Sequence, residues 1–107
     1  METMTQIVNT ISKALSVKFM EYNKDQYYFT KFVDGYDLDV RLTLDNWNKA
    51  IRIEAKLFGD AIKFKSETFA DINSVSVLKE VSAIVENAKS LVKSIETFTN
   101  KKGVYSY

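Results

Sequence analysis

Carboxylate side chains recur at odd-numbered positions in the middle of the chain, at Asp37, Asp39 and Asp45. If this segment is a β-strand, alternate residues project from one face, and the carboxylates of Asp37 and Asp39 lie side by side. Oxygen ligands of this kind bind Mg²⁺. A magnesium site needs several converging ligands, however, and an open strand face does not bring them together. We therefore predict no metal site.

Histidine and cysteine are absent from the chain. Histidine is the commonest general base and metal ligand, and cysteine supplies thiol nucleophiles and thiolate metal ligands. An enzyme would have to use Asp37, Asp39 or a tyrosine, and no motif places a second reactive group beside them. This hypothesis ranks last, and we predict no enzymatic activity, no catalytic residue and no cofactor.

Aromatic and arginine side chains offer binding chemistry instead. We expect Tyr28, Phe32 and Trp47 to be exposed, with Arg41 and Arg52 near them. Aromatic and arginine anchors carry most of the binding energy at protein–protein interfaces. These five residues therefore predict a surface that binds a protein partner.

Single-stranded nucleic acid is the alternative partner, because bases stack on exposed aromatic side chains beside basic residues. Four carboxylates stand among those basic residues, at Asp37, Asp39, Glu54 and Glu67. They would repel phosphate groups, and a binding groove for nucleic acid usually shows a net basic stripe. A protein partner is therefore preferred over nucleic acid.

The elements that would position these side chains are four β-strands. Apolar and polar residues alternate in four segments, residues 26–33, 36–45, 50–58 and 62–68. Asp34-Gly35 and Gly59-Asp60 are hairpin dipeptides, and each predicts a two-residue turn. One face of the sheet would be apolar and the other polar.

No turn dipeptide joins the second and third of these strands, so the register between them must be predicted from charge. One register places Arg41 opposite Arg52, which is a like-charge pair. The other places Arg41 opposite Glu54 and leaves a four-residue loop at residues 46–49. Cross-strand pairs are worth roughly 0.2–1 kcal/mol each. We predict the second register. The Gly59-Asp60 turn would then align Glu54 with Lys65 on the next strand.

Two helices flank the predicted strands. Thr3 begins a capping box and an apolar stripe that runs to about Phe19. A second helix is predicted from Ser74 to about Phe98. It would run to roughly 37 Å, whereas strands of this length span roughly 26 Å. The excess predicts an overhang, and its apolar residues around Leu91 to Phe98 could form a homodimer seam.

The remaining residues, 100–107, are predicted to be a flexible tail or a short edge strand, with Asn100 or Gly103 ending the helix.

The element order α-β-β-β-β-α predicts an α+β fold in residues 1–107, a single domain. We expect a two-layer sandwich, in which a four-stranded antiparallel meander carries both helices on one face. The other face would be open to solvent.

Composition limits the partners further. The 107 residues carry 15 basic and 14 acidic side chains, so no strong field attracts nucleic acid or an anionic membrane. The chain has no apolar run of 18 residues and no signal-peptide pattern. The absence of cysteine is consistent with a cytoplasmic protein. We predict a small non-enzymatic protein-binding module that acts as an adaptor or inhibitor of a larger assembly. Accessory proteins of phages and mobile elements often have such compositions.

Overall fold

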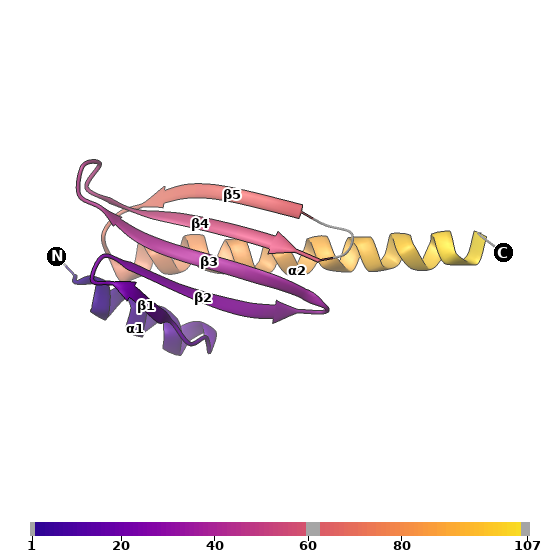
Figure 1. The fold of residues 1–107 in the computed structure, drawn as a ribbon, viewed down its shortest axis with the longest axis horizontal. Helices are drawn as coiled ribbons and strands as arrows, with labels where there is room; N and C mark the ends of the chain where they lie inside the picture. The colour runs from indigo at the N-terminus through magenta and orange to yellow at the C-terminus, as the bar shows by residue number, and fades with distance from the viewer. Residues whose placement is uncertain (1, 60–62, 106–107) are drawn as a thin grey trace.

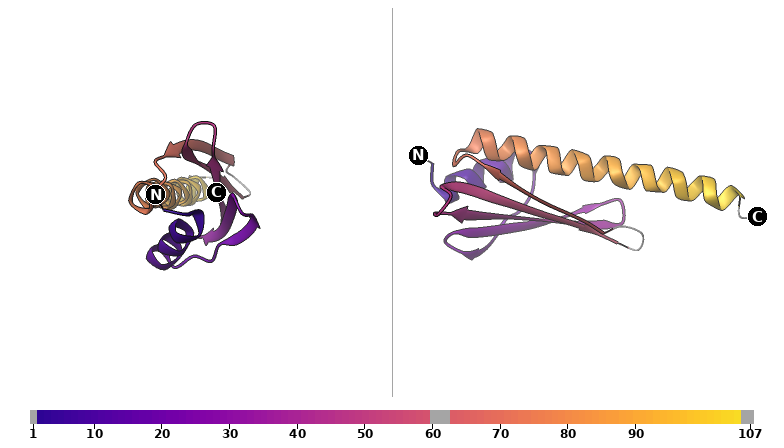
Figure 2. Two further views of the ribbon diagram at one scale, coloured as in Figure 1. Left: turned by 90° about the vertical axis from the view of Figure 1, so that its left-hand side faces the viewer. Right: turned by 90° about the horizontal axis from the view of Figure 1, so that it is seen from above.

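The computed structural model describes residues 2–59 and 63–105, and the side chains of residues 2–59 and 64–94. A five-stranded antiparallel sheet packs against two helices, α1 (Met4–Leu15) and α2 (Ser74–Tyr105), which lie on the same side of it (Figures 1 and 2). The strands neighbour one another in chain order: β1 (Met20–Asn23), β2 (Gln26–Val33), β3 (Tyr36–Asp45), β4 (Ala50–Phe58) and β5 (Lys63–Ala70). The predicted α+β two-layer fold is confirmed, with one strand more than predicted.

The N-terminal helix is shorter than the sequence predicted. Its capping box is formed as expected, with the Thr3 side chain accepting from the Gln6 N–H and the Gln6 side chain accepting from the Thr3 N–H. The helix ends at Leu15 because Ser16 adopts a left-handed conformation, with φ of 54° and ψ of 45°. A predicted helix to Phe19 is therefore wrong.

The residues after that turn form β1, which the sequence analysis missed. Met20 pairs with Tyr28 of β2, so a short strand is added at the edge of the sheet. Phe19 precedes it and packs edge-on against Phe29, with ring centroids 5.0 Å apart. Phe19 therefore reaches the core from an extended segment and not from the helix.

Two of the three predicted registers are confirmed. Val33 pairs with Tyr36 across the turn at Asp34 and Gly35. Arg41 pairs with Glu54, and a four-residue loop joins β3 to β4, as charge pairing predicted.

The register between β4 and β5 differs from the predicted one by two residues. Glu54 pairs with Glu67, and Lys56 pairs with Lys65, so like charges face each other. The predicted two-residue turn at Gly59-Asp60 and its pairing of Ile62 fall partly outside the described residues.

The hydrophobic pattern does not choose between these two registers, because a shift of two residues keeps every side chain on its face. The observed register lets β5 continue to Ala70, which pairs with Ile51 and is buried. Charge pairs worth roughly 0.2–1 kcal/mol each do not outweigh a longer strand with an additional buried residue.

The core lies between the sheet and the two helices. It takes alternate residues from the strands and one stripe from each helix. The fully buried larger side chains are Phe29, Ile7, Ile11, Leu38, Leu42, Ile51, Ile53, Leu57, Val40, Val77, Val81 and Val92. Because this core occupies one face of the sheet only, the other face carries the polar residues.

Helix α2 extends well past the sheet (Figure 1). Its 32 residues span about 48 Å at 1.5 Å per residue. The helix continues through Asn100 and Gly103, where the sequence predicted its end, to Tyr105, and residues 106–107 lie outside the described residues. The predicted homodimer seam begins at Leu91, which packs against the chain's own core, and the side chains of residues 95–98 lie outside the described set.

A clasp joins the starts of the two helices. The Glu2 carboxylate accepts a hydrogen bond of 2.6 Å from the Ser74 N–H and another from the Ser74 hydroxyl. The Asn73 side chain accepts from the Ser76 N–H and caps the same helix end. A carboxylate at a helix N-terminus also interacts favourably with the helix dipole. Glu2 therefore holds the N-terminal segment against α2.

The clasp should make folding stability sensitive to acid. The hydrogen bonds from Ser74 lower the pKa of Glu2 below its ordinary value of 4.5. A carboxyl group with a lowered pKa in the folded state stabilises the fold above its unfolded pKa, and this contribution is lost as the pH falls through the folded pKa. We expect Glu2→Gln to lower the free energy of unfolding at neutral pH and to flatten its decline below pH 4.5.

Denaturant unfolding, followed by circular dichroism over a range of pH, measures this change. Ser74→Ala is the matched variant, because it keeps the backbone hydrogen bond and removes only the hydroxyl one. It should show an intermediate pH dependence. If Glu2→Gln and the unsubstituted chain lose stability in parallel on acidification, the clasp does not contribute.

Candidate functional site

No described element covers the face of the sheet that turns away from both helices, and we call it the open face (Figure 2). It includes Met20 and Asn23 of β1, the even-numbered residues of β2 and β4, and the odd-numbered residues of β3 and β5. Successive side chains of a strand point to opposite faces, so each strand supplies every second residue. The two edges of the sheet bound this face.

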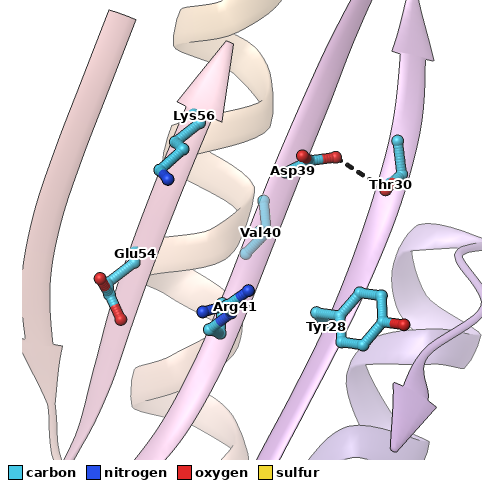
Figure 3. A pocket seen from close by; sticks show the side chains of 7 residues that line it. All are labelled: Tyr28, Thr30, Asp39, Val40, Arg41, Glu54 and Lys56. Atoms are coloured by element: carbon cyan, nitrogen blue, oxygen red, sulfur yellow. Dashed lines mark hydrogen bonds between the residues drawn. The ribbon is translucent and has the colours of Figure 1, made fainter. Parts of the chain in front are cut away.

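A hollow of about 190 Å³ lies near the centre of the open face (Figure 3). Its lining residues come from β2, β3 and β4, and they are Tyr28, Thr30, Asp39, Val40, Arg41, Glu54 and Lys56. The Thr30 hydroxyl donates a hydrogen bond of 2.7 Å to Asp39 Oδ1. The hollow thus presents two cations and two carboxylates, which can bind donors and acceptors of another molecule.

The charged side chains of this face pair differently from what their register suggests. Arg41 and Glu54 are neighbours across the strands. Glu54 nevertheless forms its ion pair with Arg52, on its own strand, with 3.5 Å between Arg52 Nε and Glu54 Oε1. No described carboxylate lies within 4.0 Å of the Arg41 guanidinium. Arg41 is also exposed. Its donors are therefore available to a partner.

Large apolar side chains stand exposed around this charged centre. Phe32 and Phe58 flank Asp37 on either side, and they are 71% and 42% exposed. Met20 is 50% exposed and pairs with Tyr28. Sequence reasoning missed Met20, because it did not predict β1. The alternation of Phe19, which faces the core, with Met20 is the signal that could have shown it.

The five predicted partner-binding residues do not gather at one point. Tyr28 and Arg41 pair across β2 and β3, and Arg52 lies two residues from Glu54 on the next strand. Phe32 lies near the turn between β2 and β3, whereas Trp47 belongs to the loop between β3 and β4, at the opposite end of the sheet. Phe32 pairs with Asp37, and the eight residue steps from Asp37 to Asp45 at the other end of β3 span about 26 Å. The open face is therefore a long surface and not a compact pocket.

The loop that carries Trp47 is held by Asp45. Asp45 Oδ1 accepts hydrogen bonds of 3.0 Å from the N–H groups of Trp47 and Asn48, and Oδ2 accepts from the Asn48 side chain at 2.8 Å. The hydrogen bonds from Asn48 are the main cause that lowers the pKa of Asp45 below its ordinary value. The Trp47 side chain is 92% exposed. A fixed loop therefore projects a large aromatic side chain into solvent.

Within residues 2–59 and 63–105, no group of three acidic, histidine or cysteine side chains converges as metal ligands would. In the same described part of the chain, neither helix is both long and apolar enough to cross a bilayer.

Compared with known proteins, the chain matches no family model, no curated protein and no solved structure. Its function must therefore be inferred from the geometry and chemistry of the open face.

Proposed function

We propose that this chain is a non-enzymatic protein-binding module of the cytoplasm, which acts as an adaptor or inhibitor of a larger assembly. The open face is its binding surface. The observation that carries the proposal is the exposure of Phe32, Phe58 and Met20 on a sheet face that neither helix covers.

Burial of these side chains would supply binding energy. Removing apolar surface from water contributes about 25 cal/mol per Å², or about 1.5–3 kcal/mol for a phenylalanine side chain. Phe32 and Phe58 lie on either side of one strand, so a single partner segment can cover both. Aromatic side chains with a nearby arginine are the usual composition of interface hot spots. Arg41 supplies that cation in the central hollow.

The charge pattern of the open face favours a protein over a nucleic acid. Going across the strands, Asp39 faces Lys56, and Arg41 faces Glu54. Such alternation offers complementary contacts to a polypeptide surface with both signs of charge. A phosphate backbone would meet a carboxylate beside almost every cation, which weakens binding. A surface of mixed charge with exposed aromatic side chains suits a docking role.

Removal of the aromatic groups tests the proposal. We expect the variant with both Tyr28→Ser and Phe32→Ser to bind its partner at least about 25-fold more weakly, because truncation of a hot-spot residue typically costs about 2 kcal/mol or more. The partner is first captured by cross-linking in an extract of the native host and identified by mass spectrometry. The affinity of the purified partner is then measured by calorimetry for each variant.

Val75→Ser is the matched control, because Val75 is an exposed apolar residue, 78% exposed, that lies on α2 and not on the open face. It should leave the affinity unchanged. Equal affinities for all three proteins would exclude the open face as the docking surface. Tight binding of a single-stranded oligonucleotide at low salt, lost steeply as salt is added, would replace the protein partner with nucleic acid.

A further inference from the structure

The edge strand β5 differs from the edge strand at the other side of the sheet. β5 has eight residues and β1 has four, with an irregular register between Glu21 and Asn23. β5 pairs with β4 alone, and no element of the described residues lies beyond its outer edge (Figures 1 and 2). The chain contains no proline that would block pairing there. A long, regular edge strand presents free N–H and C=O groups to another strand.

Three features of β5 remain unsatisfied within one chain. Glu67 faces Glu54 and Lys65 faces Lys56, and like charges directly opposite each other are unfavourable. The Ser66 hydroxyl is buried and makes no hydrogen bond within the described residues. A buried polar group without a partner is destabilising. All three features lie in the middle of the edge strand.

We propose that β5 pairs with β5 of a second copy of this chain, antiparallel and about a two-fold axis at Ser66. The two sheets would join into one of ten strands, five from each copy. In such a symmetric antiparallel pair, the residue one step before the axis lies opposite the residue one step after it in the other copy. With Ser66 opposite Ser66 of the second copy, Lys65 lies opposite Glu67 of the second copy. The charge pattern of the strand is thus complementary to itself.

This register resolves each unsatisfied group. Glu67 lies between Glu54 and Lys65 of the second copy, and Lys65 lies between Lys56 and Glu67 of the second copy. The two Ser66 hydroxyls meet across the axis, where serine pairs form hydrogen bonds. Two other registers keep the open faces of both sheets on the same side. An axis at Lys65 places Lys65 opposite Lys65 of the second copy, and an axis at Glu67 places Glu67 opposite Glu67 of the second copy. Of these three registers, the one about Ser66 alone places no like charges opposite each other between the copies.

Charge reversal separates the pairing between copies from the pairing within one chain. Sedimentation equilibrium should give twice the chain mass of 12.3 kDa for the unsubstituted protein, with concentration-dependent dissociation. Lys65→Glu should raise the dissociation constant of the dimer about 10-fold, because it reverses two symmetry-related pairs. Glu67→Lys should do the same. The double variant restores opposite charges between the copies and should restore the dimer.

The same two charge reversals should not destabilise the monomer, although they weaken the dimer. Lys65→Glu places a carboxylate opposite Lys56, and Glu67→Lys places a cation opposite Glu54. In solutions too dilute for the dimer, neither single variant should have a lower thermal midpoint than the unsubstituted chain. Weaker association with an unimpaired monomer is the signature of the proposed register.

Cross-linking locates the axis. The protein has no cysteine, so Ser66→Cys introduces a single thiol, and opposed residues in an antiparallel pair have the Cα separation that a disulfide needs. Mild oxidation should convert most of this variant to a covalent dimer. Thr5→Cys, at an exposed site on α1, should form no covalent dimer under the same oxidation. A monomeric unsubstituted protein, or a dimer that both single charge reversals leave intact, would overturn the proposal.

Discussion

Replacing Phe29 with alanine is expected to lower the free energy of unfolding by about 3–5 kcal/mol, the largest effect of any single substitution considered. Phe29 is fully buried in β2, and its ring packs edge-on against Phe19 at 5.0 Å. Truncation leaves a cavity between the sheet and the helices, and it also removes the contact that holds the segment leading into β1. Denaturant unfolding followed by circular dichroism measures the loss.

Phe32→Ala is the matched control for Phe29→Ala, because Phe32 lies on the same strand but points into solvent from the open face. It should change the free energy of unfolding by less than about 0.5 kcal/mol. Phe29→Leu retains part of the buried volume and should fall between the two, which keeps the comparison measurable if the alanine variant unfolds. Similar losses for Phe29→Ala and Phe32→Ala would contradict the assignment of the two faces.

Gly59→Ala is the second substitution with a large expected effect, a loss of about 1–3 kcal/mol. A Cβ atom at Gly59 would lie 2.5 Å from Tyr36 Cε1 and 3.1 Å from Tyr36 Cγ. The ring of Tyr36 packs against the core, so it has to move for an alanine to fit. The space above Gly59 is therefore occupied, and the same denaturant measurement detects the strain.

A double-mutant cycle separates this contact from other effects at residue 59. With Tyr36→Ala already present, Gly59→Ala should cost much less, because the ring that it meets is gone. Gly35→Ala provides a contrast, since nothing lies within 4 Å of a Cβ atom there and its cost comes from the φ of +93°. Tyr36→Ala should not relieve that cost. Additive losses at Gly59 and Tyr36 would show that the contact is not the cause.

The confirmed and the wrong registers show what charge patterning can predict. Charge chose correctly between β3 and β4, where the rejected alternative placed Arg41 opposite Arg52. It failed between β4 and β5, where Glu54 meets Glu67. Both registers there keep the apolar face buried, so the outcome depends on strand length and on the loop, which the alternation does not encode.

Helix boundaries were the other features that periodicity did not determine. The apolar stripe of α1 passes through Leu15 to Phe19 at helical spacing, so the stop at Ser16 is not visible in it. Phe19 nevertheless reaches the core, from an extended segment. At the other end, Asn100 and Gly103 are common helix stops, yet α2 runs through both. Apolar periodicity and local stop residues therefore predicted that each helix exists but not where it ends.

The open face could be predicted from alternation, because each strand between residues 26 and 70 carries most of its charged residues on one side. Lys31, Ser66 and Thr68 are polar exceptions that lie on the apolar side. The edge at β1 is much harder to predict, since all four residues of this strand are exposed and only the step from Phe19 to Met20 carries a signal. The separation of Phe32 from Trp47 also required the register and the direction of the strands. The sequence therefore indicated which aromatic and arginine side chains are candidates for binding, but not how far apart they lie.

The overhang of α2 affects how the size of this protein should be measured. The molecule extends 58 Å along its longest axis and only 25 and 22 Å along the others. Its radius of gyration is 15.8 Å, against about 13 Å for a compact globule of the same length. Such a rod-like particle elutes early from a gel-filtration column, so a single copy can imitate a heavier sphere. Elution volume alone would therefore overstate its mass.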